Sequence, residues 1–372
     1  MTAYRFLHSS DLHLGRAFAN FPEGIRHRLR EARHGAIGRL AAAARLGGAT
    51  TILLAGDTFD AVTPAPETLR QALAAMREAA DLTWVLLPGN HDSLDATELW
   101  RRIATDGPAN LRALTSDAPV ELATGVWLLP APCTQRQPGR DLTEAMSAAT
   151  PEGVLRIGLG HGAITDFSGE EGTTGIIPPD RAKRSGLDYL ALGDWHGQLR
   201  VSPTTWYSGT PEPDGFKHEA PASALLVSFD GPSPLVTPAA TASFRWLRPQ
   251  IDVLPGEDAP ARIDAVLPKA GARDHLVRLT LKGHLPLAER AALEADLAHR
   301  APDFGWFSAD LTGLGVEALP EDLDQIDRAG ALRQAAEMLL AEANDTSLSQ
   351  IERDTATSAL ARLYALSQEV RA

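Results

Sequence analysis

Short apolar runs alternate with amphipathic segments through the first two hundred residues, and this alternation restricts the fold more than any other feature of the sequence. Residues 25–46 and 65–80 have helical composition and spacing. The apolar runs are rich in Leu or β-branched residues and stop at turn-forming or polar residues, as buried strands do. They lie at 5–9, 50–55, 83–87, 126–129, 155–160 and 189–192. Strands that alternate with helices predict an α/β fold, in which helices cover the faces of a sheet.

The second half of the chain has a different pattern. Residues 249–318 are expected to run strand, helix, strand, helix, strand, which is a small α+β unit. Residues 320–372 are almost all helix-forming, and Asn344-Asp345-Thr346-Ser347 is expected to divide them into two helices. Further strands are expected at 205–207, 224–229 and 243–247. We therefore predict three parts, with the boundaries 1–248, 249–318 and 319–372.

Composition excludes some classes of protein. The chain has 372 residues and a single cysteine, Cys133, so neither an intrachain disulfide nor a cluster of metal-binding thiolates can form. No run approaches the roughly 20 apolar residues that cross a membrane, and no basic segment followed by an apolar run opens the sequence. We expect a cytoplasmic protein without membrane contacts.

The charge is unfavourable for a protein that binds nucleic acid, because the formal net charge is −13. Residues 23–45 are a local exception, since six arginines stand there against Glu23 and Glu31, which gives +4. This basic segment is either a solvated helix face or a surface that contacts phosphates.

Metal-binding residue types follow five of the predicted strands directly. They are Asp11 and His13, Asp57, Asn90 with His91, His161, and Asp194 with His196. Each motif alone is also common in ordinary turns. Taken together they are informative, because the carboxyl ends of strands in an α/β sheet converge on one edge, where ligands bind. Oxygen and imidazole ligands without sulfur suit Mn, Fe, Zn or Mg, and their number exceeds the need of one ion. The sequence therefore predicts a site for two metal ions.

These motifs also carry a family resemblance. In order they read Asp-x-His, Gly-Asp-x-x-Asp, Gly-Asn-His-Asp, Gly-His and Gly-x-x-His over residues 8–197, and this combination resembles the calcineurin-like metallophosphoesterase superfamily. Within that superfamily, the sequence most resembles the SbcD-type DNA repair exonucleases. That likeness rests on residues 8–15 and on the segment 207–211, with Phe216 and Glu219 after it.

The resemblance implies a fold and a set of partners. The fold would be a four-layer αββα sandwich with a small α+β capping domain at 249–318 and a helical C-terminal tail. The cap has the same position along the chain as the DNA-facing domain of the family. The tail has the position of the segment that binds an SbcC-like coiled-coil ATPase. A second copy of the chain is a further candidate partner.

The resemblance also implies a role for each site residue. One metal would be held by Asp11, His13, Asp57 and His196, and the other by Asp57, Asn90, His161 and the residue at 194. His91 would be the catalytic proton donor to the leaving oxygen. Two divalent ions are implied, with manganese favoured and magnesium, iron or zinc as alternatives. Asp194 departs from the SbcD-type pattern, which usually has His there, and this departure bears on the affinity and identity of the second metal.

Three functions follow from this reading. The first is a DNA exonuclease or endonuclease of a DNA repair complex, which hydrolyses phosphodiester bonds with a water activated by two metal ions. The second is a phosphodiesterase or phosphatase that acts on nucleotides or other small molecules, which the acidic net charge favours. The third is a non-catalytic scaffold for an ATPase, against which the intact ligand set argues.

Overall fold

The computed structural model describes residues 3–165, 176–217, 222–231, 233–317 and 320–371. The chain divides into two compact units, Met1–Phe244 and Arg245–Ala372. We call them the N-terminal and C-terminal units. The predicted boundary between a cap and a tail falls at 318–319, which lie outside the described residues. The expected three-part functional division stays a prediction.

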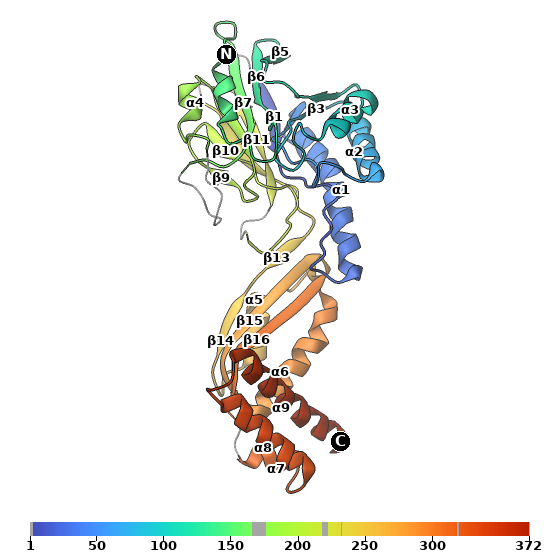
Figure 1. The fold of residues 1–372 in the computed structure, drawn as a ribbon, viewed down its shortest axis with the longest axis vertical. Helices are drawn as coiled ribbons and strands as arrows, with labels where there is room; N and C mark the ends of the chain where they lie inside the picture. Colours follow the sequence, from blue (N-terminus) through green and yellow to red (C-terminus); the bar gives the residue numbers. More distant parts are fainter. Residues whose placement is uncertain (1–2, 166–175, 218–221, 232, 318–319, 372) are drawn as a thin grey trace. The chain divides into compact units, whose positions relative to one another are not determined.

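Two six-stranded sheets form the N-terminal unit (Figure 1). The first has the order β12-β11-β1-β2-β3-β4, in which β1, β2, β3 and β4 are parallel to one another. Its strands are β1 (Tyr4–Ser9), β2 (Thr51–Leu54), β3 (Thr83–Leu86), β4 (Leu111–Ala113), β11 (Ser223–Phe229) and β12 (Leu235–Ala240). The second has the order β5-β6-β7-β8-β10-β9. Its strands are β5 (Val120–Ala123), β6 (Val126–Ala131), β7 (Leu155–His161), β8 (Tyr189–Gly193), β9 (Leu199–Arg200) and β10 (Thr205–Tyr207).

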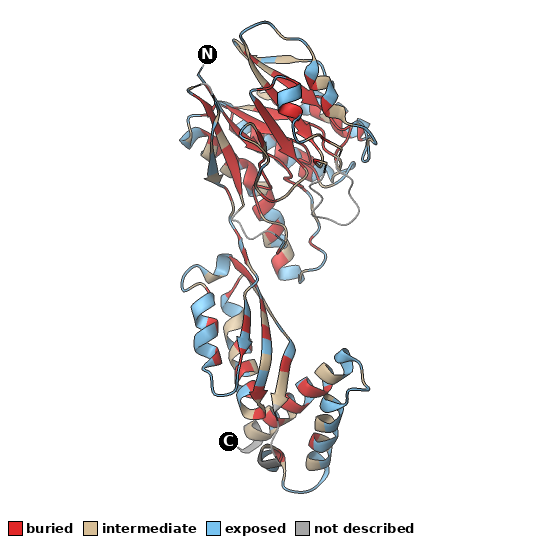
Figure 2. Cartoon of the chain, turned by 90° about the vertical axis from the view of Figure 1, so that its left-hand side faces the viewer, coloured by how far each residue is buried: buried red, intermediate tan, exposed pale blue. Residues whose placement is uncertain are grey.

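The side chains of the first sheet alternate between two cores. Leu7, Ile52 and Trp84 pack against the helices α1 (Glu23–Leu46), α2 (Pro66–Glu78) and α3 (Thr97–Asp106). The next residues along β2 and β3, Leu53 and Val85, pack against the second sheet instead. The outer face of the second sheet is covered by the 3₁₀ helix η1 (Leu142–Ser147) and the short α4 (Arg181–Arg184). Helices thus flank two sheets whose central strands are buried on both faces (Figure 2), which confirms the four-layer αββα fold.

All nine strands predicted before residue 248 are present to within about two residues at each end. The prediction missed the helices α3, η1 and α4 and the strands β4, β5, β9 and β12. All four missed strands are the edge strands of the two sheets. They are short or largely exposed, so their sequences contain no apolar run. In β12 only two of six residues are even half-buried, and Pro238 interrupts the run.

The C-terminal unit contains a small parallel sheet. The strands β13 (Arg245–Leu247) and β14 (Gln250–Val253) pair along one edge of β15 (His275–Pro286), and β16 (Trp306–Glu317) pairs along the other. The helices α5 (Ala259–Val266) and α6 (Leu287–Arg300) connect β14 to β15 and β15 to β16, with short 3₁₀ helices at Ala272–Asp274 and Ala301–Asp303. This order agrees with the sequence prediction. The sheet and both helices share an apolar core of their own.

Three helices end the chain: α7 (Pro320–Ile326), α8 (Ala331–Asn344) and α9 (Gln350–Arg371). The prediction of two helices is wrong in number, because a second break occurs at 327–330, where Gly330 has a φ of +113°. Leu360 is buried against Leu287 of α6, whereas Leu332 and Leu366 are exposed. The apolar side chains of the helices are therefore divided between an internal core and the surface. Among the described helices, none is long and apolar enough to span a membrane.

Candidate metal centre

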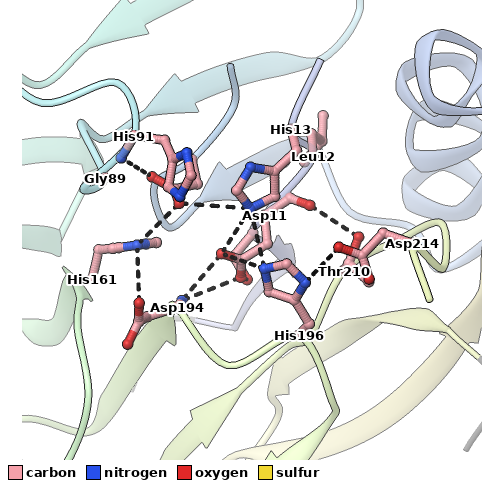
Figure 3. Close-up of polar contacts among 12 residues, drawn as sticks. Asp11, Leu12, His13, Gly89, His91, His161, Asp194, His196, Thr210 and Asp214 are labelled. Carbon is pink, nitrogen blue, oxygen red and sulfur yellow. Dashed lines mark hydrogen bonds and ion pairs between the residues drawn. The ribbon is translucent and has the colours of Figure 1, made fainter. Parts of the chain in front are cut away.

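The parallel strands β1 and β2 bring the first two motifs together. Beyond the strands the two loops continue to pair, since the backbone N–H of Asp11 donates to Gly56 O (3.1 Å) and that of His13 donates to Asp57 O (3.0 Å). On the second sheet, β7 and β8 are also parallel, and His161 lies opposite Gly193, the residue before Asp194. The strand ends of both sheets thus supply side chains to one cluster (Figure 3).

Backbone strain is concentrated at these strand ends. Asp11, His13 and Asp57 have φ values of 54°, 42° and 52°, and Asp194 has a φ of 102°. Such left-handed conformations cost residues other than glycine about 1–3 kcal/mol each and persist where the surroundings fix them, often at functional sites. The cluster is therefore held in place by its neighbours rather than by local backbone preference.

Glycines make the close packing around the cluster feasible. A Cβ atom on Gly89 would lie 2.1 Å from Asp57 Oδ1, and one on Gly193 would lie 2.0 Å from Ala55 O. Both distances are far shorter than atoms tolerate. The glycines of the Gly-Asn-His-Asp and Gly-Asp-x-His motifs are thus required so that the loops can approach one another.

Two imidazoles point at a common position. His13 Nε2 lies 3.1 Å from His196 Nε2, while the Nδ1 atoms face Asp60 Oδ1 (3.0 Å) and Asp214 Oδ2 (2.9 Å). Because Nδ1 of each ring faces a carboxylate, the neutral ring carries its proton there and both Nε2 atoms present lone pairs. Two nitrogens bound to one metal at about 2.0–2.1 Å lie roughly 3 Å apart. Asp11 Oδ1 is 4.0 Å and 3.9 Å from the two Nε2 atoms, so the three groups can hold one ion.

His161 belongs to a second group of candidate ligands. Its Nδ1 is 2.8 Å from Ala55 O, which leaves Nε2 free to face Asp57 Oδ2 (3.6 Å) and Asp194 Oδ1 (3.8 Å). Asp57 Oδ2 is also 3.6 Å from His13 Nε2, so this one carboxylate lies between the two groups. Asn90 Oδ1 and His161 Nε2 are buried and have no hydrogen-bond partner among the described residues. Buried polar atoms without a partner are costly, and a cation would satisfy both.

The electrostatics of the cluster also favour cations. Burial alone would lower the pKa of His161, but the charges of Asp57, Asp11 and Asp194 outweigh it and raise the pKa to about 9. Burial, with the charges of Asp11 and Asp194, raises the pKa of Asp57 to about 6 although His161 opposes the shift. The cluster therefore has a local excess of negative charge. Its donor set of carboxylates, imidazoles and an amide fits two divalent ions.

His91 lies beside the cluster. Its backbone N–H donates to Asp57 Oδ1 (2.8 Å), its Nδ1 is 2.9 Å from Asp60 O, and its ring is 4.8 Å from that of His13. This position suits a residue that moves a proton next to the metals. His13, Asp60 and His91 also have a spacing that could hold an ion, so a ligand role for His91 stays the alternative.

Sequence reasoning missed the residues that hold the ligands in place. Asp214 lies 2.9 Å from His196 Nδ1, 3.1 Å from Arg16 and 3.6 Å from the buried Arg33. Burial opposes ionisation, but the hydrogen bond to His196 and the two guanidinium groups hold the pKa of Asp214 well below its usual range. Asp92 accepts hydrogen bonds from the backbone of Gly89 (2.7 Å) and Phe59 (3.0 Å), and so joins two of the loops.

The segment 207–211, singled out in the sequence, supports the first strand loop. Thr210 Oγ1 donates to Asp11 O (2.9 Å), and Ser208 Oγ lies 2.9 Å from Ser10 Oγ. Phe216 is buried, whereas Glu219 lies outside the described residues. This segment therefore contacts the metal-binding loop without contributing a candidate ligand.

A family model and two known proteins match this chain. The family model for calcineurin-like phosphoesterases matches residues 4–198, which is more than half of the chain. The uncharacterized metallophosphoesterase YhaO of Bacillus subtilis is 27% identical over 309 residues, which cover 77% of this chain and 73% of that protein. Among solved structures, TT1561 of Thermus thermophilus matches 64% of this chain and 99% of its own, with 12% identity and a TM-score of 0.41.

Proposed function

The chain belongs to the calcineurin-like phosphoesterase family, and on that premise we propose that it is a two-metal phosphodiesterase that acts on DNA, similar to the SbcD-type repair exonucleases. The observation that supports this proposal most strongly is the common orientation of three imidazole rings. His13, His161 and His196 each turn Nδ1 to a protein oxygen and Nε2 toward the same group of carboxylates. In this arrangement all three rings are oriented toward a metal before any metal arrives, and binding would displace the Nε2 proton that the neighbouring carboxylates favour on His161.

Each residue then has a defined role. Asp11, His13, Asp57 and His196 would hold one ion, and Asp57, Asn90, His161 and Asp194 the other. Bound divalent ions supply Lewis acidity and activate water at neutral pH. The protein positions the substrate phosphate, and His91 delivers a proton to the departing oxygen, since Asp60 O fixes its ring next to the cluster.

The structure bears on the proposed role of Asp194. Its backbone N–H donates to both carboxylate oxygens of Asp11 at 3.2 Å, and its own carboxylate lies near His161. The carboxylate that orients His196 is that of Asp214. We therefore propose that Asp194 binds the second ion, directly or through water, instead of orienting His196.

We also propose that α8 and α9 bind an SbcC-like coiled-coil ATPase. These helices expose Leu332, Met338, Ile351 and Leu366, whose exposed fractions range from 41% to 79%. Truncation after residue 319 should spare hydrolysis of a small phosphodiester and abolish co-purification with such an ATPase. Because α9 also packs on α6, loss of solubility on truncation would report on that internal core. The exposed-site variant Leu332→Asp/Leu366→Asp then replaces the truncation, and co-purification that survives it would overturn the proposal.

One experiment tests the catalytic proposal. Protein stripped of metal with EDTA is supplied with Mn²⁺, Mg²⁺ or Zn²⁺ and assayed on bis(4-nitrophenyl) phosphate, 4-nitrophenyl phosphate, linear duplex DNA and single-stranded DNA. We expect Mn²⁺-dependent cleavage of the diester and of DNA with free ends. Cleavage of the monoester or of small nucleotides with DNA left intact would support the small-molecule phosphodiesterase instead. No hydrolysis with any metal would overturn both.

A further inference from the structure

A cleft opens beside the second group of ligands. Its volume is about 540 Å³, which falls within the range of ordinary ligand pockets. Its lining includes three candidate ligands, Asn90, His161 and Asp194, together with residues 136–140 of the loop after β6. A substrate whose scissile phosphate lies at the metals would therefore extend into this cleft.

Two arginines of that loop line the cleft and have no partner among the residues that the structure describes. Arg136 and Arg140 are exposed, and neither guanidinium has a hydrogen bond or ion pair with a described residue. Other arginines of the N-terminal unit are engaged: Arg39 pairs with Glu212, Arg45 with Asp81 and Arg181 with Asp141. In a chain with a net charge of −13, two unengaged cations at one cleft are available for an anionic ligand.

The basic segment of α1 is a useful contrast. The sequence offered these arginines as candidates for phosphate contact, yet Arg33 is buried and donates to Leu12 O, and Arg26 donates to Phe21 O. Arg28 lies over the ring of Phe244 at 5.0 Å. Most of the α1 guanidinium groups are thus committed to the protein, so Arg136 and Arg140 are the better placed cations for substrate.

The remaining lining of the cleft indicates the kind of anion. A guanidinium group binds phosphate through two parallel hydrogen bonds, with more geometric selectivity than a lysine gives. Leu142, Ile176 and Ile177 form apolar walls in the same cleft. A nucleotide offers a phosphate to the guanidinium groups and a base to the apolar walls. A simple phosphodiester has neither a second phosphate nor a base.

We propose that Arg136 and Arg140 form a subsite for a phosphate adjacent to the scissile one, with the attached nucleoside against the apolar walls. This inference rests on the proposed phosphodiesterase function and assigns the substrate class, a nucleotide chain with consecutive phosphates. It also explains how an acidic protein attracts a polyanion, because the attraction is local to the cleft.

The test compares the double variant Arg136→Gln/Arg140→Gln with a control of equal charge change, Arg70→Gln/Arg77→Gln, in which both exposed arginines lie on α2. The measured quantity is selectivity, the kcat/KM for a single-stranded oligonucleotide divided by that for bis(4-nitrophenyl) phosphate. We expect the cleft variant to lose about 10- to 100-fold in selectivity, the value of one or two charge-assisted hydrogen bonds. The control should stay within about twofold of the wild type.

Binding measurements separate this inference from the proposed function. Metal-free protein is titrated with a phosphorothioate oligonucleotide at several salt concentrations. Removal of two contacts should lower the slope of log K against log salt by about 1.4, and Arg136→Lys/Arg140→Lys should restore the slope but not the full affinity. A wild type that binds the oligonucleotide through the arginines but hydrolyses nothing would refute the proposed function alone. Unchanged selectivity, or equal affinity and slope in wild type and cleft variant, would overturn the arginine subsite alone.

Discussion

The two units treat buried polar groups in opposite ways. Where burial is described in the C-terminal unit, its buried polar side chains are His275, Arg290 and Thr357, and each has an internal partner. In the N-terminal unit, Asp11 and His161 belong to a buried cluster whose functional atoms face one another at 3.6–4.0 Å. In the C-terminal unit these three residues are paired, and a lone buried atom such as Arg300 Nε belongs to a side chain whose other nitrogens pair with Asp264 and Asp296. The N-terminal unit instead gathers several unpaired polar atoms in one cluster arranged for a cation.

Backbone conformation separates the units in the same way. The described residues with positive φ in the C-terminal unit are all glycines, such as Gly256 and Gly283. In the N-terminal unit, four of the five such residues that are not glycine are candidate metal ligands. Strain and unmatched charge coincide at one place, which is the pattern expected where stability is sacrificed for function.

Asp57, the carboxylate between the two groups of candidate ligands, provides the strongest test of this contrast between the units, because its substitution should have the largest effect on activity. Asp57→Asn should lower Mn²⁺-dependent hydrolysis of bis(4-nitrophenyl) phosphate by more than about 10³-fold, because the ions contribute several kcal/mol to transition-state stabilisation. The same variant should raise the thermal midpoint of the metal-free protein. It removes a buried negative charge, and asparagine tolerates the left-handed backbone that residue 57 adopts.

The control is Asp117→Asn, an exposed position of the same unit, which should change neither quantity. A metal-free Asp57→Asn protein that is less stable than wild type would show that the cluster is not a site of unmatched charge. The contrast between the two units would then be one of composition only.

The next effect concerns His91. His91→Ala should lower kcat for a dinucleotide about 10²- to 10⁴-fold, the usual range for general acid catalysis, while bound Mn²⁺ stays at the wild-type count. The loss should be smaller for bis(4-nitrophenyl) phosphate, whose nitrophenolate leaves without a proton. Bound metal is counted by elemental analysis after gel filtration. If metal content falls in step with activity, His91 is a ligand.

A smaller effect is expected at Asp214, which contacts His196 and not the proposed ion. Asp214→Ala should weaken binding at the first metal position about 10- to 100-fold, as loss of a group that orients a ligand commonly does. Asp214→Asn keeps an oxygen that can accept the proton of His196 Nδ1, so it should retain most of the affinity. Calorimetric titration of the metal-free proteins with Mn²⁺ measures both. Equal losses in the two variants would favour a purely structural role.

Substitution of Asp194 should change which metal ion binds more than how many ions bind. Asp194→His replaces a hard oxygen ligand by an imidazole near His161 Nε2, so we expect the preference between Zn²⁺ and Mn²⁺ to shift about tenfold toward Zn²⁺. The readout is competition binding of the two ions to metal-free protein. Unchanged stoichiometry together with unchanged preference would show that Asp194 binds no ion, even through water.

Much of this site was predictable because the ligands lie at strand ends. A strand rich in apolar residues is recognisable from its own sequence, and the residue after it is then placed at a known edge of the sheet. This reasoning located Asp11, Asp57 and His161 without knowledge of which strand pairs with which. It could not assign the strands to two sheets, because alternation of strands and helices carries no information on pairing.

The supporting residues escaped prediction for a different physical reason. Asp214 lies in a loop, and its importance arises from the approach of Arg33 and His196, which are 181 and 18 residues away in the sequence. Arg33 reads as one more cation on an amphipathic helix, although it is 1% exposed. Long-range ion pairs leave no periodic signal, so they emerge only when the packing is known.

The smallest effect on activity is expected in the C-terminal unit, and it tests whether the units are independent. Arg290 is buried and donates to Glu294 (Nε to Oε1, 2.9 Å) and to the backbone oxygen of Leu314. Arg290→Ala leaves that oxygen unsatisfied, which costs about 1–3 kcal/mol and should lower one thermal transition by several degrees. Hydrolysis of bis(4-nitrophenyl) phosphate at 25 °C should stay within about twofold of wild type, because the metal cluster draws every candidate ligand from the N-terminal unit.

The matched control is Arg262→Ala, which removes an exposed pair with Glu257 and should leave the transition in place. A loss of activity while both units remain folded would mean that the C-terminal unit supports the metal centre, and the contrast between a self-sufficient unit and a cation-dependent one would no longer hold.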